Sequence, residues 1–147
     1  MKPFRFRLEK LLEFRNIQKE QSQIIFLQAT NQLRSEKELL AKLKGKLAEN
    51  IVLLNTRQQQ SLTIEIFKSF GYYFDKIGGD IAKQNQCVIQ ADEHREECLR
   101  TLIEAEKKHK IVEKFREKKL QHYQIEALNE EQKLLDEIGI QIYTRKK

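Results

Sequence analysis

Residues 26–54 read FLQATNQLRSEKELLAKLKGKLAENIVLL. In this stretch an apolar side chain recurs at every seventh residue, at Phe26, Leu33, Leu40, Leu47 and Leu54. A strict seven-residue spacing keeps one face of an α-helix apolar over such a length only when the helix winds around a partner helix. The stretch therefore predicts a coiled coil.

A second repeat of the same spacing lies downstream and can supply the partner helix. Its members are Phe67, Phe74, Ile81, Val88 and, after Arg95, Leu102. Two repeats in one chain favour pairing within the chain. We therefore expect an all-α fold, an antiparallel two-helix coiled-coil hairpin in which the second helix is longer than the first.

The turn has two candidate positions, at Gly78-Gly79 and in the polar stretch 55–61, where Ser61 or Thr63 can cap a new helix. A turn at the glycines would place Leu40 opposite Glu117, and burying an unpaired carboxylate is costly. A turn near residue 60 joins apolar residues instead. The pairs are then Leu54 with Phe67, Leu47 with Phe74, Leu40 with Ile81 and Leu33 with Val88.

These pairs predict one domain, residues 1–147, with a helix at about 4–57, a turn at about 58–61 and a helix at about 62–143. Gly78-Gly79 then lies inside the second helix as a soft stretch. Polar residues at core positions, such as Glu36, predict a hairpin that is looser at its base than at its tip. Roughly the last 25 residues overhang, because residue 4 pairs near residue 117, and their apolar stripe needs a partner.

Aromatic side chains are concentrated near the predicted tip. The repeat places Phe67 and Phe74 in the seam, so that Phe70, Tyr72 and Tyr73 should point outwards. Exposed aromatic rings are typical of protein-binding surfaces. An alternative is a β-hairpin at residues 62–66, where apolar and polar residues alternate.

The composition argues against other functional classes. The chain has 147 residues, of which 34% are charged, and a net charge of +6. We expect no enzyme, cofactor or metal site, because the three histidines are scattered and no phosphate-binding loop occurs. The basic residues favour a solvated helix face over nucleic-acid binding. Charges near the N-terminus and the absence of a long apolar run predict a cytoplasmic protein.

Two terminal motifs carry a family resemblance. Residues 4–15 read FRFRLEKLLEFR, and residues 129–138 read NEEQKLLDEI and are followed by basic residues. Both resemble the flagellar export protein FliJ family, and the resemblance extends over the whole chain. It implies a soluble coiled-coil component of the bacterial flagellar type III export apparatus, similar to the central stalk of rotary ATPases.

The resemblance also implies partners. The end that carries both termini would bind the hexameric flagellar export ATPase, and the opposite region would bind the cytoplasmic domain of the export gate protein. Export chaperones would be further partners, and the chain would reach the inner membrane only through these proteins. The expected ATPase-binding residues are Lys10, Arg15, Lys133, Leu134, Ile138 and Arg145. The expected gate-binding residues are Phe70, Tyr73 and Ile77, with Leu39 and Leu43 beside them.

Two other classes remain open at this point. A prefoldin-like helical-hairpin chaperone would have β-structure at residues 62–74 and would form hexamers. A generic coiled-coil scaffold or nucleic-acid-binding protein would bind DNA with a steep dependence on salt.

Overall fold

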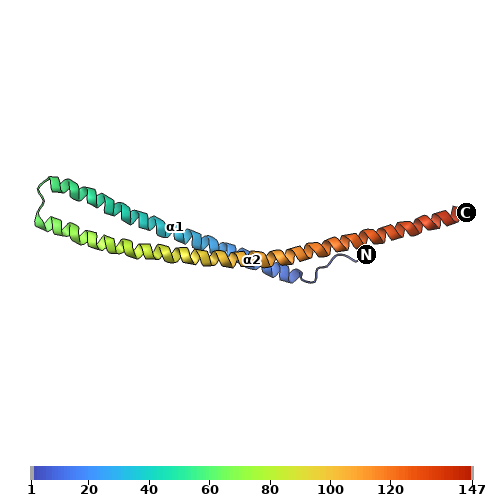
Figure 1. Cartoon of the computed structure of the whole chain (residues 1–147). Coiled ribbons are helices and arrows are strands. Elements are labelled where there is room, and N and C mark those ends of the chain that lie inside the picture. The colour runs from blue at the N-terminus through green and yellow to red at the C-terminus, as the bar shows by residue number, and fades with distance from the viewer. Residues whose placement is uncertain (1, 147) are drawn as a thin grey trace. The chain divides into compact units, whose positions relative to one another are not determined.

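The computed structural model describes residues 2–146, which form two α-helices, α1 (Glu9–Gln59) and α2 (Ile64–Lys146), joined by residues 60–63 (Figure 1). With 51 residues in α1 and 83 in α2, the predicted all-α hairpin with a longer second helix is confirmed. Residues 2–146 contain no strand, so the β-hairpin at residues 62–66 is wrong. Residues 64–74 belong to α2, so the β-structure that a prefoldin-like chaperone would have at residues 62–74 is absent there.

The helix starts follow from local sequence. Thr63 caps α2, because its Oγ1 accepts a hydrogen bond of 3.3 Å from the backbone N–H of Ile66. The first helix begins at Glu9, five residues later than expected from the repeat. Pro3 precedes an alternation of apolar and basic residues, and a period of two fits extended chain rather than helix. Residues 2–6 are accordingly extended, and a turn at Arg7 and Leu8, closed by a hydrogen bond from the Glu9 N–H to the Phe6 carbonyl, leads into α1.

The described chain divides into two compact units, Ser22–Leu102 and the pair of segments Met1–Gln21 and Ile103–Lys147. Each unit contains part of α1 and part of α2. We describe them separately as the middle unit and the terminal unit. The expectation of a single domain stays a prediction.

In the middle unit the helices pack antiparallel through a mixed apolar and polar seam. Gln84 Nε2 donates a 2.9 Å hydrogen bond to the backbone carbonyl of Glu36 and a second, short one to the Glu36 carboxylate. Arg95 lies 5.1 Å from the centre of the Phe26 ring. These contacts correspond to the pairing expected for a turn near residue 60. The buried apolar residues of this unit are Ala29, Leu33, Ile77, Cys98 and Leu102.

The tip of the middle unit is less buried than its centre. No residue between 34 and 76 is buried, and Phe67, expected in the seam, is 53% exposed. The expectation of a tight tip is therefore wrong. An α-helix drifts by roughly 20° per heptad relative to a seven-residue repeat. Along most of α2 the residues that face α1 include Phe74 and Ile81. At the start of α2 the residue that faces α1 is therefore Ile66, which is half-buried, and not Phe67.

Gly78 and Gly79 lie within α2, which continues through them. Neither has a positive φ, and a Cβ added at either position would meet no atom within 4 Å. The pair therefore marks neither a turn nor a close approach between helices.

The terminal unit has a smaller seam. Its buried apolar residues are Ala105 and Val112, and Arg116 Nε lies 3.0 Å from Glu9 Oε2. Among the described residues, no helix is apolar over a length that would cross a membrane.

Candidate interaction sites

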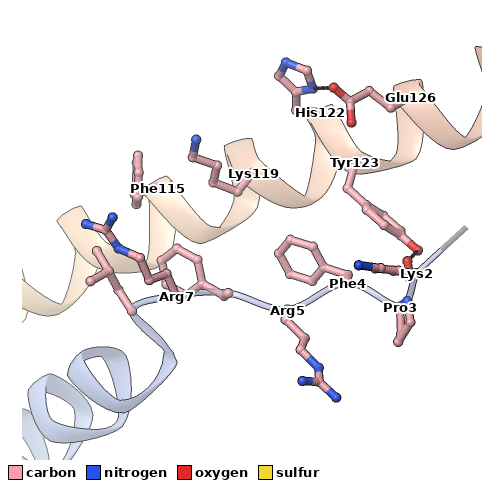
Figure 2. A pocket seen from close by; sticks show the side chains of 12 residues that line it. Lys2, Pro3, Phe4, Arg5, Arg7, Phe115, Lys119, His122, Tyr123 and Glu126 are labelled. Carbon is pink, nitrogen blue, oxygen red and sulfur yellow. Dashed lines mark hydrogen bonds and ion pairs between the residues drawn. The ribbon is translucent and has the colours of Figure 1, made fainter.

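The segment of residues 2–8, which we call the arm, packs along α2 in the terminal unit; it is extended as far as Phe6 and turns at Arg7 and Leu8. Phe4, Phe6 and Leu8 are half-buried, whereas Arg5 and Arg7 are exposed. Successive side chains of an extended chain point to opposite sides, so the alternation places the apolar ones towards α2. Figure 2 shows the Phe4 ring directed at Tyr123 while Arg5 points away from the helix.

Aromatic contacts hold the arm. The ring centres of Phe6 and Phe115 are 5.7 Å apart, and those of Phe4 and Tyr123 are 5.5 Å apart. Such tilted pairs each contribute about 0.5–1.5 kcal/mol beyond the burial of their area. The Tyr123 hydroxyl also donates a hydrogen bond to the backbone carbonyl of Lys2. The arm is therefore an ordered part of the terminal unit.

Charged groups border the same contact. Arg116, which pairs with Glu9, also lies 5.7 Å from the centre of the Phe4 ring, and the Lys119 ammonium lies 5.4 Å from that of Phe115. His122 Nδ1 is 3.3 Å from a Glu126 carboxylate oxygen on the outer side of α2. An open groove runs between the arm and α2. Its lining is aromatic and basic, which suits binding rather than catalysis.

The arm shortens the predicted overhang. An extended residue advances by about 3.3 Å and a helical one by about 1.5 Å. Phe4 therefore reaches Tyr123 rather than the vicinity of residue 117, and α2 remains half-buried as far as Ala127. From residue 128 to residue 146 every side chain is exposed.

This exposed part of α2 carries an apolar stripe, which we call the C-terminal stripe. Its residues share one helix face at spacings of three, four and seven. They are Leu128, Leu134, Leu135, Ile138 and Ile142. Leu134 is 58% exposed and Ile138 44%, as the expected ATPase-binding site requires.

The basic residues of the expected ATPase-binding site are not equivalent. Lys10, Lys133 and Arg145 are exposed. Arg15 is half-buried; it donates a 3.1 Å hydrogen bond to Gln18 and lies 5.8 Å from the centre of the Phe14 ring. Lys10, Lys133 and Arg145 can therefore contact a partner directly. Arg15 would first have to give up its contacts with Gln18 and Phe14.

The expected gate-binding residues are only partly on the surface. Ile77 is 4% exposed and lies in the seam of the middle unit, so it offers no open surface to a partner. Phe70 and Tyr73 are half-buried, and the Tyr73 hydroxyl accepts a 3.2 Å hydrogen bond from Asn50. Tyr72, which was not among the expected gate-binding residues, is 73% exposed and is the ring of this group that is most open to solvent.

The two leucines of α1 assigned to this site differ as well. Leu39 is exposed and Leu43 is half-buried. Leu43 is one heptad before Asn50, in a row that faces α2. Leu39 is therefore the better candidate for a contact outside the chain.

A cysteine–histidine contact was missed by the sequence analysis. Cys98 Sγ lies 3.7 Å from His94 Nε2, one helical turn earlier. The thiol side chain is buried, and a reactive thiol has to be accessible. No group of three or more potential metal ligands occurs among residues 2–146. The contact therefore belongs to the seam.

Comparison with known proteins gave one match. The sequence model of the flagellar FliJ protein matches residues 4–147. No curated protein and no solved structure matches the chain.

Proposed function

Because the chain belongs to the flagellar FliJ protein family, whose members are components of flagellar protein export, we propose that it is a non-enzymatic stalk. It would link the hexameric export ATPase to the cytoplasmic domain of the export gate. It would work in the cytoplasm, held at the inner-membrane export apparatus by its protein partners and escorting export chaperones. The observation that carries the proposal is the C-terminal stripe.

The stripe supports an ATPase contact because nothing in the described chain covers it. Leu134 and Ile138 supply apolar area, and Lys133 and Arg145 supply positive charge nearby. Charge complementarity between partners accelerates association, whereas buried apolar side chains provide most of the affinity. Lys10 would add charge from α1, and Arg15 would act mainly through its position beside Phe14.

The sharpest test alters the stripe and leaves the arm intact. Leu134→Asp/Ile138→Asp should weaken binding to the purified export ATPase by at least about tenfold, since two apolar side chains that the complex would bury are lost. The control is Ile140→Asp, because Ile140 is more exposed than either residue, at 65%, but lies on the opposite helix face. Equal affinities for the double variant and the wild type, measured by biolayer interferometry, would refute the assignment.

A truncation after Ala127 tests the same site in a second way. It removes the stripe but keeps Tyr123 and the aromatic contacts of the arm. We expect unchanged helix packing in the remaining chain and loss of ATPase stimulation. Normal binding and stimulation by this truncated chain would contradict the proposal.

The gate contact rests on the aromatic residues at the start of α2. Phe70 and Tyr73 are half-buried, Tyr72 and Leu39 are exposed, and Ile77 would support the others from the seam. We expect Phe70→Ala/Tyr72→Ala to weaken binding of the gate's cytoplasmic domain while helix content stays near the wild-type value. Unchanged affinity in this folded double variant would refute the contact.

Tyr73 needs a variant that separates recognition from folding. Tyr73→Phe removes only the hydroxyl that Asn50 contacts, whereas Tyr73→Ala removes the ring. If the ring binds the gate, Tyr73→Phe binds normally and Tyr73→Ala binds weakly. If both variants lose thermal stability but bind normally once folded, the residue is structural.

A further inference from the structure

The C-terminal stripe carries two charges as well as its apolar side chains. Glu131 and Arg145 are each seven residues from Ile138, one on either side, and seven residues are close to two helical turns. Both therefore lie on the same face as Ile138. The stripe reads acid, apolar, base along its length, and all three side chains are exposed.

Two copies of this charge pattern are complementary only when the two helices run antiparallel. In a parallel pair of stripes Glu131 would face Glu131 and Arg145 would face Arg145, and like charges at a seam oppose association. In an antiparallel pair aligned at Ile138, Glu131 of each copy lies level with Arg145 of the other. We propose that the C-terminal stripe pairs antiparallel with the same stripe of a second copy of this chain.

Three of the five apolar residues of the stripe fit the same alignment, whereas Leu135 lies level with Gln141 and Leu128 lies outside the paired length. Leu134 and Ile142 are each four residues from Ile138, so each lies level with the other across the pair. Ile138 of one copy then meets Ile138 of its partner at the two-fold axis, as an isologous interface requires. Glu130 and Lys146 repeat the charge match one residue further out at either end.

The length of the stripe is sufficient for a reversible contact. From Leu128 to Arg145 the helix advances about 26 Å at roughly 1.5 Å per residue. Two helices that pair over four to five turns bury a narrow seam, which is typical of weak association rather than of a permanent dimer. The dimer should therefore form and dissociate with concentration.

This association does not depend on the proposed function. Leu134 and Ile138 are also assigned to the ATPase contact, so a second copy would cover that contact when the ATPase is absent. The experiment below uses the purified chain alone. If the purified chain does not dimerise, the ATPase assignment is unaffected. If the chain does not bind the ATPase, the dimer proposal is unaffected.

The test is sedimentation velocity of the full chain over a range of concentrations, with two charge-reversal variants. We expect reversible dimers of the wild type, and about tenfold or greater weakening for Glu131→Arg and for Arg145→Glu, since each places like charges opposite one another. A mixture of the two variants should associate again, because every charge then meets its opposite. The control Glu137→Arg makes the same charge change away from the stripe and should associate like the wild type.

Three results would overturn the proposal. The first is a wild type that stays monomeric at all concentrations, which would leave the stripe to a different partner. The second is that both reversal variants associate as strongly as the wild type. The third is that the mixture of the two variants fails to associate. Far-ultraviolet circular dichroism checks folding, and the exposure of Glu131 and Arg145 predicts wild-type helix content for both variants.

Discussion

The Gln84–Glu36 contact allows a prediction about the energy of the seam. Gln84 is 8% exposed and is the buried polar residue among the described side chains. Its amide donates to both the carbonyl and the carboxylate of Glu36. Gln84→Leu removes both hydrogen bonds and leaves the Glu36 carboxylate facing an apolar side chain.

The expected loss follows from these contacts. A hydrogen bond to a charged group contributes about 1.5–3 kcal/mol and one to a carbonyl about 0.5–1.5 kcal/mol. The new leucine side chain offsets about 1–2 kcal/mol through burial. At the midpoints of these ranges, we therefore expect Gln84→Leu to lower the free energy of unfolding by roughly 2 kcal/mol. In Gln84→Leu/Glu36→Leu no charge remains at this position of the seam, so stability should return to the wild-type value or exceed it.

The assay is urea unfolding followed by circular dichroism, on the wild type, both single variants and the double variant. The four free energies form a double-mutant cycle, and contact between the residues predicts a coupling energy of about 0.5–3 kcal/mol. Additive effects of the two substitutions would refute the reasoning. A Gln84→Leu variant as stable as the wild type would do so as well.

Three further predictions concern single features of the structure. Leu33→Ala should lower the free energy of unfolding by about 2–3 kcal/mol, at the low end for a buried leucine because the seam is narrow. Leu27→Ala, at an exposed position, should lower it by less than about 0.5 kcal/mol. Equal urea midpoints for the two variants would show that the seam lies elsewhere. Gly79→Ala should raise the stability by about 0.5–1 kcal/mol, since the added methyl meets open space within a helix, and a lower melting temperature would contradict this. Phe4→Ala/Phe6→Ala should accelerate hydrogen exchange at Tyr123 and its neighbours in α2 without changing exchange in the middle unit, and unchanged exchange would show that the arm does not protect the helix.

The sequence predicted the two helices and their order, because both depend on strong periodic signals, and it offered Thr63 as one of two candidate caps. Leu33, Leu40 and Leu47 define a face, and a matching face downstream defines the pairing. The partner of Glu36 could not be predicted in the same way. A polar residue at a core position is usually unfavourable, and only the structure places the Gln84 amide against the backbone carbonyl and the carboxylate of Glu36.

Two site features depended on weaker signals. The depth of Ile77 could not be predicted because a seven-residue spacing does not say which of two neighbouring rows lies deeper. The arm was missed because its alternation is only five residues long, from Phe4 to Leu8, and was interpreted as the start of the helix. The signal was present, since a period of two predicts extended chain, but a short alternation is ambiguous beside a long helical repeat.

The extended arm makes the terminal unit unusually sensitive to the length of its first residues. Deleting one residue between Pro3 and Phe6 would turn every side chain on the N-terminal side of the deletion to the opposite face. If Arg5 were deleted, Phe4 would take its place and point to solvent, and Pro3 would take the place of Phe4 beside Tyr123. The same deletion within a helix would rotate the flanking side chains by only about 100°. A single lost codon in this segment would therefore invert the arm, although the composition of the chain would hardly change.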